Sequence, residues 1–133
     1  VMGAETQSND NNIQHTILIV DEEANVLTLL GLILKRGGFK VVTAQSGIAA
    51  LDMIDNQMPK MVITDITMPG MDGIELCRTL RSREDTKDIL IVIHSARSDT
   101  ESIQRSMDAG ADDYFQKPIL QADLIARVNA LLE

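Results

Sequence analysis

Short apolar runs alternate with longer amphipathic segments along this chain. Four runs are almost continuously apolar, as expected for strands of a parallel sheet that helices cover on both faces. They are Ile17–Val20, Met61–Thr64, Ile89–Ile93 and the shorter Tyr114–Gln116. Lys40–Ala44 is a fifth candidate strand. Five strands that alternate with helices predict an α/β fold with a doubly wound parallel sheet.

The segments between the strands carry apolar residues at helical spacing. The predicted helices span about Ala24–Arg36, Gly47–Gln57, Ile74–Ser82, 99–109 and Gln121–Leu132. Gly37 and Gly38 should end the first helix, and Pro59 should stop the second. Ser98 and Glu101 have the spacing of a capping box, so we expect Ser98 to open the fourth helix.

Composition narrows the class of protein. The 133 residues suffice for one domain with a real core, which must be aliphatic because only 2% of residues are aromatic. A net charge of −8 argues against binding nucleic acid through its phosphates. Cys77 is the single cysteine, so no internal disulfide can form, which fits a cytoplasmic location. We expect Cys77 to lie in the core. No apolar run approaches the roughly 18 residues of a membrane span, and no signal peptide is visible.

The first residues differ from the rest of the chain. Residues 1–14 are polar and show no periodicity, so we expect a disordered leader. Residues 15–133 should then form the folded domain.

Polar side chains stand at or just past the ends of the strands. Asp21 and Glu22 follow the first strand, Asp65 follows the third, Ser95 closes the fourth and Lys117 follows the fifth. Parallel strands bring these positions to one edge of the sheet, where ligands of α/β proteins bind. Three carboxylates, a hydroxyl and an ammonium there favour Mg²⁺ and a phosphoryl group. A carboxylate can itself attack phosphorus and form an acyl phosphate.

Each of these features alone has a plain structural explanation. An acidic pair after a strand is often a polar turn, a serine at a strand end is usually structural, and Lys-Pro is common in loops. The order and the strand-end placement of all five residues together favour a functional site.

Four segments resemble the receiver domain of two-component response regulators. They are ILIVDEE at 17–23, VITDITMPGMDG at 62–73, IVIHSA at 91–96 and GADDYFQKPI at 110–119. The resemblance covers about residues 15–133 and implies a flavodoxin-like sheet of order 2-1-3-4-5. It also implies a phosphorelay role, in which a histidine kinase or histidine phosphotransfer protein donates the phosphoryl group. The domain would then switch an output domain or partner, and it would be no enzyme beyond assisting its own phosphorylation and dephosphorylation.

The resemblance assigns a role to each acidic residue of the edge. Asp65 matches the phosphoacceptor, and Asp21 and Glu22 match the acidic pair that holds Mg²⁺. Thr67 matches the position whose backbone carbonyl completes the metal site. Glu22 stands where the commonest pattern has a second aspartate, and its longer side chain should still reach the metal.

The resemblance also implies a switch. Ser95, in place of the commoner threonine, matches the hydroxyl residue that moves to meet the phosphoryl group. Lys117 matches the lysine that contacts that group, and its bond to Pro118 is expected to be cis. Tyr114 matches the aromatic residue that turns inward when Ser95 moves.

Two further positions are open to more than one interpretation. His94 stands where an apolar residue is usual; we expect it to be buried in the strand, or else to modulate the switch or its pH response. Arg97 and Thr67 match positions that tune dephosphorylation in the family.

A possible dimer surface follows from the same resemblance. Asp113 and Arg127 match residues that form intermolecular salt bridges in receivers that dimerise through the face made by residues 99–132, and Asp123 fits this pattern too. Ile103 replaces a basic residue usual in that subfamily. Ordinary surface charge is the alternative explanation for the charged residues.

Two competing functions are left open. Haloacid-dehalogenase-like phosphatases also form an aspartyl phosphate, but they have a second aspartate two residues after the nucleophile, where this chain has Thr67. A degenerate receiver that binds partners without phosphorylation is the other alternative. The cognate kinase, and whether the chain acts alone or within a longer regulator, stay open.

Overall fold

The computed structural model describes residues 14–133, so the expected leader lies outside the described residues except for its last position. The elements in chain order are β1 (Thr16–Val20), α2 (Ala24–Arg36), β2 (Lys40–Ala44), α3 (Gly47–Asn56), β3 (Met61–Thr64), α4 (Gly73–Ser82), β4 (Leu90–Ser95), α5 (Thr100–Asp108), β5 (Asp113–Gln116) and α6 (Gln121–Leu132). Each predicted element is present, with bounds that differ by at most two residues.

The strands form one parallel sheet in the order β2-β1-β3-β4-β5, which confirms the predicted fold. The register aligns the carboxyl ends of neighbouring strands. Val20, the last residue of β1, pairs with Ala44 on one side and Thr64 on the other. Ser95 ends β4 beside Gln116 of β5. The residues that follow the strands therefore meet at one edge.

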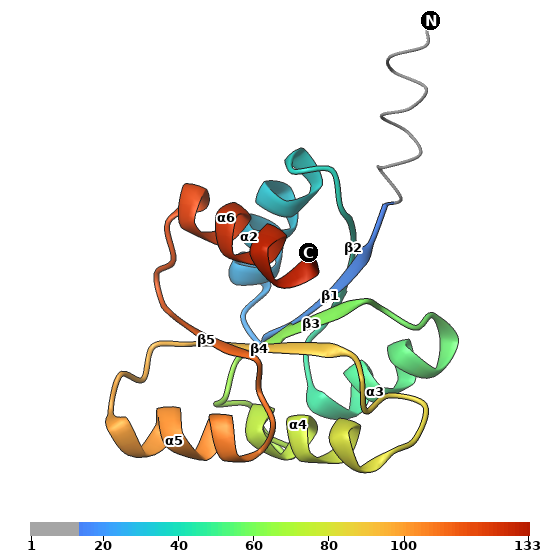
Figure 1. Cartoon of the computed structure of the whole chain (residues 1–133), viewed down its shortest axis with the longest axis vertical. Helices are drawn as coiled ribbons and strands as arrows, with labels where there is room; N and C mark the ends of the chain where they lie inside the picture. The colour runs from blue at the N-terminus through green and yellow to red at the C-terminus, as the bar shows by residue number, and fades with distance from the viewer. Residues whose placement is uncertain (1–13) are drawn as a thin grey trace, which may run out of the picture.

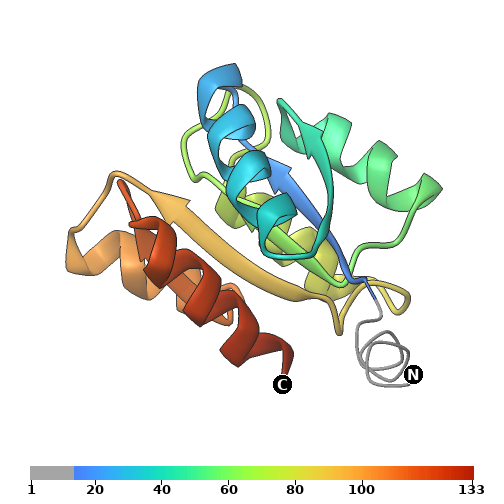
Figure 2. The ribbon, with the colours of Figure 1, turned by 90° about the horizontal axis from the view of Figure 1, so that it is seen from above.

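Helices cover both faces of the sheet (Figure 1). α2 and α6 lie on one face, and α3, α4 and α5 lie on the other. Figure 2, seen from above, shows α2 and α6 in front of the sheet and α4 and α5 behind it. The apolar strands are explained by this arrangement, because successive side chains of β1 enter opposite layers: Ile17 and Ile19 face α2 and α6, while Leu18 and Val20 face α3 and α4.

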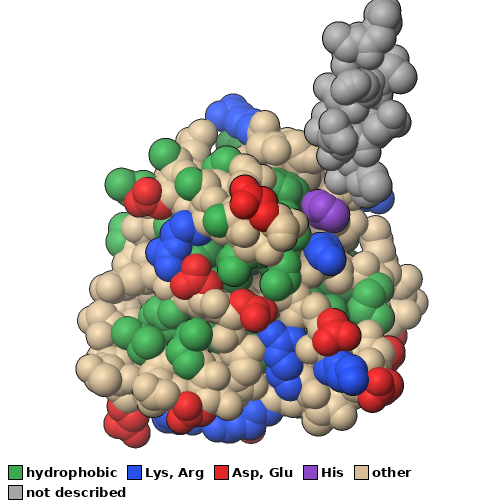
Figure 3. Space-filling model, viewed as in Figure 1, with side chains coloured by type: hydrophobic (Ala, Val, Ile, Leu, Met, Phe, Trp, Pro, Cys, Tyr) green, Lys and Arg blue, Asp and Glu red, His purple; other side chains and the backbone are tan. Residues whose placement is uncertain are grey.

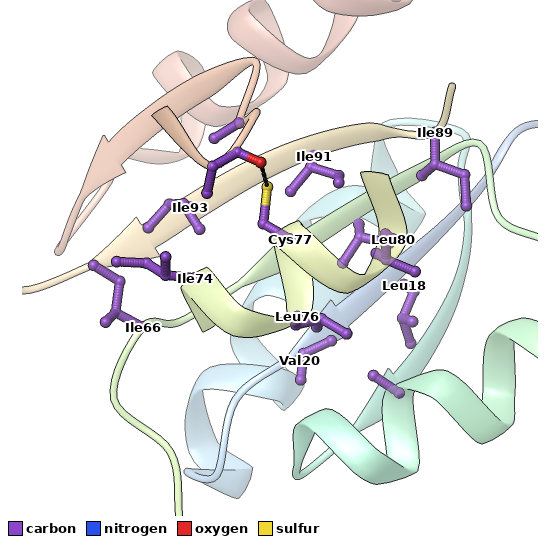
Figure 4. Packing of buried hydrophobic residues seen from close by; sticks show 14 of the residues in the cluster. Leu18, Val20, Ile66, Ile74, Leu76, Cys77, Leu80, Ile89, Ile91 and Ile93 are labelled. Carbon is purple, nitrogen blue, oxygen red and sulfur yellow. Dashed lines mark hydrogen bonds between the residues drawn. The ribbon is translucent and has the colours of Figure 1, made fainter. Parts of the chain in front are cut away.

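The core is aliphatic, as the composition predicts. On the α4 side, Leu76, Cys77 and Leu80 point from the helix onto Ile91 and its neighbours in the sheet (Figure 4). These four residues are completely buried. Shortening one of the leucines to alanine would cost about 2–5 kcal/mol of stability, because it leaves a cavity.

The start of α5 differs from the sequence-based expectation. The prediction that Ser98 caps this helix in a capping box is wrong. Asp99 is the N-cap of α5, and its carboxylate accepts a hydrogen bond from Ser102 N at 2.9 Å. This bond lowers the pKa of Asp99. A carboxylate is a stronger acceptor for the first-turn amides than a hydroxyl, so the helix begins one residue later. A capping box does occur in α4, between Asp72 and Glu75.

The outer surface mixes charges of both signs. Figure 3 shows acidic and basic side chains interspersed, and apolar side chains gathered over the region of β5 and α5 at the lower left. Within residues 14–133, no helix has both the length and the apolar character needed to cross a membrane.

Candidate phosphoryl-acceptor site

A pocket of about 370 Å³ lies at the carboxyl edge of the sheet. The loops after β1, β3, β4 and β5 line it with Glu22, Glu23, Asp65, Thr67, Ser95, Ala96, Arg97 and Lys117. Sequence reasoning missed Glu23, although an acidic residue directly after Asp21-Glu22 was a visible signal. A larger hollow of about 1020 Å³ lies between α2 and α3 over β2, and none of the predicted site residues line it.

The sheet itself positions the key side chains. Three backbone hydrogen bonds of 2.8–3.1 Å continue the ladder one residue past the strands: Asp21 N to Ala44 O, Asp65 N to Val20 O and Lys117 N to Ser95 O. Because side chains alternate along a strand, these residues point to the face of the sheet that α2 and α6 cover.

Lys117 joins the two aspartates. Its Nζ donates to Asp21 Oδ2 at 2.9 Å and to Asp65 Oδ2 at 3.1 Å, with Glu23 Oε1 at 4.0 Å. Burial lowers the pKa of Lys117, but the hydrogen bonds and negative charges of the two aspartates outweigh it and leave the pKa above its usual 10.5. The lysine therefore stays charged and offsets part of the negative charge of the pocket.

The two aspartates differ in accessibility. The Asp21 side chain is 1% exposed, and its other oxygen accepts a hydrogen bond from Glu23 N at 2.9 Å. Asp65 is 12% exposed and lines the pocket, while its Oδ1 accepts from Ile66 N at 2.7 Å. Of the two carboxylates bound to Lys117, that of Asp65 lines the pocket, while that of Asp21 lies buried behind it.

Helix α4 begins directly against the backbone of Asp65. Gly73 N donates to Ile66 O at 2.9 Å. A Cβ atom on Gly73 would lie 2.8 Å from the carbonyl carbon of Asp65, and closer still to the carbonyl oxygen. Only glycine permits this approach. The sequence showed a glycine at the helix start but gave no sign of this contact.

The oxygen-rich composition of the pocket suits Mg²⁺, which takes oxygen ligands and often only one or two carboxylates. Glu22 and Thr67 are exposed at its rim. Across residues 14–133, however, no three acidic, histidine or cysteine side chains converge closely enough to enclose a metal ion. The Lys117 ammonium, not a third carboxylate, connects Asp21 and Asp65.

Comparison with known proteins identifies the family. The sequence model of the response regulator receiver domain matches residues 17–129, most of the chain. The chain belongs to the response regulator receiver family. It is 43% identical over 116 residues to the response regulator MprA of Mycobacterium sp. strain KMS, a match covering 87% of this chain and 50% of that protein. The chain thus spans about half the length of the curated relatives it matches.

Solved structures agree with this assignment. A Chloroflexus aurantiacus protein described as a response regulator superimposes with a TM-score of 0.86 and 37% identity, over 90% of this chain and 98% of that one. The receiver domain of DrrB, in a BeF3-activated form, gives a TM-score of 0.82 and 30% identity, over 90% and 98% of the two chains.

The residues expected to switch this receiver are linked through one loop. Ser95, 1% exposed, accepts a hydrogen bond at Oγ from Arg97 N at 3.1 Å. The half-buried Tyr114 donates its hydroxyl to Arg97 O at 2.6 Å. Ser95 and Tyr114 thus both bind the segment that leads into α5. The peptide bond between Lys117 and Pro118 is cis, as expected.

His94 of the receiver is buried, which confirms the structural expectation for it. The residue is 5% exposed, and its Nε2 has no hydrogen-bond partner within residues 14–133. Burial, reinforced by the nearby Lys117 charge, lowers the pKa of His94 to about 4, although Asp21 and Asp65 oppose the shift. His94 is therefore neutral at pH 7.

The charged residues of the expected dimer face pair within one chain. Arg127 Nη2 lies 2.7 Å from Asp113 Oδ1, and the Arg127 guanidinium stacks 4.5 Å from the centroid of the Phe115 ring. Asp123 is exposed in the first turn of α6. Ile103 is half-buried in α5.

Proposed function

We propose that Asp65 accepts a phosphoryl group and that residues 15–133 form the receiver unit that this modification switches. The accessibility of Asp65 carries the proposal: it shares Lys117 with the buried Asp21 but faces the pocket. Membership of the receiver family supports a phosphoacceptor role in two-component signalling.

The transfer would be a displacement at phosphorus. We expect the reaction to take place in the cytoplasm. A carboxylate oxygen of Asp65 attacks the phosphorus of a phosphohistidine on a kinase or phosphotransfer protein. The P–O bond forms while the P–N bond breaks, and the imidazole leaves with the electron pair on its nitrogen. Lys117 already bonds to Asp65 and can follow one phosphoryl oxygen, while the Ser95 hydroxyl can donate to another.

We propose Mg²⁺ as the cofactor, held by the carboxylates of Asp21, Glu22 and Asp65 and by the backbone carbonyl of Thr67. When bound, it supplies positive charge that offsets the charge of the phosphoryl oxygens. The chain has no tryptophan, so binding is best followed by titration calorimetry. We expect Glu22→Gln to bind Mg²⁺ more weakly than wild type. Unchanged binding would remove Glu22 from the metal site.

Acetyl phosphate with and without Mg²⁺, read by intact mass, tests the proposal. Wild type should gain one phosphoryl group in a Mg²⁺-dependent way, and Asp65→Asn should gain none. Asp88→Asn is a matched control, because Asp88 is exposed on the loop before β4. Equal gain in Asp65→Asn would show that the site is misassigned. No gain in any variant would favour the degenerate receiver, which binds partners without phosphorylation, and steady hydrolysis of free phosphoesters would favour a phosphatase.

A homodimer through the face of residues 99–132 stays a prediction. Because Asp113 and Arg127 already pair within the chain, an intermolecular pairing would have to break that contact. Light scattering of the phosphorylated protein, with Asp123→Asn as the variant, would test it. A mass that stays monomeric after complete phosphorylation would contradict the dimer.

A further inference from the structure

The proposed Mg²⁺ ligands stand on two separate loops. Asp21 and Glu22 follow β1, whereas Asp65 and Thr67 follow β3. Oxygens from two loops bind one ion tightly only if the loops are held at the right spacing, because Mg²⁺ requires near-ideal octahedral geometry. Contacts that fix the distance between these two loops therefore influence how tightly the ion binds.

The loop between β2 and α3 reaches the loop after β1 through Gln45. Its side-chain Nε2 donates to the backbone carbonyl of Glu22 at 3.1 Å. Asp21 is held separately, because its N–H donates to Ala44 O at 3.1 Å in the extended ladder of the sheet. Across residues 14–133, Glu22 makes no other hydrogen bond. The backbone of Glu22 is therefore held in place by one side chain, that of Gln45.

Two residues later, the same segment touches the loop after β3. Gly47 is the first residue of α3, and a Cβ there would lie 2.9 Å from Cβ and Cγ of Met71 and 3.0 Å from its carbonyl oxygen. Position 47 thus accepts no side chain unless Met71 moves. The loop after β3 is closed by a bond of 2.9 Å from Gly73 N to Ile66 O. A displacement of Met71 must therefore be accommodated within this loop, which includes Thr67.

The segment that makes both contacts is firmly anchored. Ser46 is the N-cap of α3, and its hydroxyl accepts a hydrogen bond from Ala49 N at 3.1 Å. The carbonyl of Ser46 accepts another from Ala50 N at 2.9 Å, and Ala50 is completely buried. The segment is thus fixed by the end of a strand on one side and by the start of a helix on the other. It can hold a spacing instead of following the loops that it touches.

A neutral amide suits the contact with Glu22. A cationic side chain at position 45 would also attract the Glu22 carboxylate and draw it away from an ion in the pocket. The amide of Gln45 donates to the backbone carbonyl and leaves the carboxylate free, and Glu22 lines the pocket. Gln45 is exposed, so its hydrogen bond contributes little to the stability of the fold.

We propose that residues 45–47 are a spacer that sets the separation of the two ligand loops, with Gln45 as a positioning residue for Glu22. The spacer rests on the proposed function, because it acts through a Mg²⁺ site that both loops form. It contacts neither the ion nor the phosphoryl group. Its effect falls on the affinity for Mg²⁺ and not on the reactivity of Asp65 in the Mg²⁺-saturated protein.

Titration calorimetry of the full chain with magnesium chloride tests the contact of Gln45. Gln45→Met keeps the length of the side chain but removes the amide that holds Glu22. Its Kd for Mg²⁺ should be roughly fivefold higher than that of wild type, the equivalent of one hydrogen bond. Gln57→Met is the matched control and should bind as wild type does, because Gln57 is exposed at the other end of α3.

Gly47→Ala tests the second contact of the spacer. Its methyl group should displace Met71, so the Kd for Mg²⁺ should rise here too. Gly31→Ala is the control, since its Cβ would lie at an ordinary 3.6 Å from Val41 Cγ1. If Gly47→Ala does not fold, Met71→Ala removes most of the side chain that Gly47 contacts and should also weaken Mg²⁺ binding. Wild-type affinity in whichever of these two variants is folded would overturn the spacer.

Phosphorylation by acetyl phosphate over a series of Mg²⁺ concentrations separates positioning from a general structural role. In Gln45→Met, the half-maximal rate should require roughly fivefold more Mg²⁺, while the rate at saturating Mg²⁺ should equal that of wild type. A lower saturating rate with an unchanged Mg²⁺ requirement would overturn the spacer. So would a Gln45→Met protein that binds Mg²⁺ as tightly as wild type, and the proposed function would stand in both cases. A wild-type protein that binds no Mg²⁺ and gains no phosphoryl group would overturn the proposed function and the spacer together.

Discussion

The substitution Gly73→Ala isolates the role of the close approach between α4 and Asp65. The added Cβ would lie 2.8 Å from the carbonyl carbon of Asp65 and 3.1 Å from the Cα of Ile66. Ordinary carbon contacts are about 3.5–4.0 Å, so the backbone of Asp65 or the start of α4 must move by about 1 Å. No flexible side chain can absorb this, because the atoms that would clash belong to the backbone.

A movement of this size should affect stability and reactivity together. Overpacking a tight site costs about 1–3 kcal/mol. A misplacement of about 1 Å at a reacting group can slow a reaction by about 10²-fold. We therefore expect Gly73→Ala to unfold at lower denaturant concentration and to gain a phosphoryl group from acetyl phosphate about a hundredfold more slowly.

Gly31→Ala is the matched control. Gly31 lies inside α2, and a Cβ there would lie 3.6 Å from Val41 Cγ1, an ordinary contact. Because alanine suits a helix interior better than glycine, this variant should be about 0.5–1 kcal/mol more stable and phosphorylated at the wild-type rate. Circular dichroism confirms that each variant is folded before rates are compared. A folded Gly73→Ala with a rate within twofold of wild type would show that the contact between Gly73 and the Asp65 backbone does not control the reactivity of Asp65.

Three further predictions follow from local contacts. The pKa of His94 is about 4 in the folded protein and about 6.5 in the unfolded chain. Above pH 6.5 His94 is neutral in both states and costs no stability. As the pH falls from 6.5 towards 4, the unfolded chain takes up a proton that the buried imidazole does not, so the protein loses at most about 3 kcal/mol of stability. Urea unfolding of His94→Leu should lack that part of the pH dependence, and an identical profile would contradict it. Asp72→Ala removes one half of the α4 capping box and should cost about 1 kcal/mol in urea unfolding; Asn in place of Asp72 should restore most of it. Burial raises the pKa of Cys77 to about 11. A thiol reagent at pH 8 should therefore label Cys77 only as fast as the protein opens. Rapid labelling of the folded protein would show that α4 does not shield the thiol.

Much of the fold was readable from the sequence because its signals are local. Strands covered on both faces appear as continuous apolar runs, and the helices between them as amphipathic periods, so all ten elements could be placed. The sheet order came from the resemblance, since periodicity says nothing about which strands are neighbours. The one wrong helix start, at Ser98, arose where two adjacent residues could both cap, and the local geometry selected Asp99.

The kind of site followed from local sequence signals, because acids, a hydroxyl and a lysine at the ends of parallel strands converge on one edge of the sheet. The difference in exposure between the two aspartates became visible in the folded chain, where Asp21 is buried and Asp65 is open beside the same lysine. The tertiary structure also decided that Gly73 touches the Asp65 backbone and that Gln45 binds the Glu22 carbonyl. Exposure and long-range hydrogen bonds depend on how helices and strands pack against one another. This packing cannot be inferred from the residues that lie next to a given residue in the sequence.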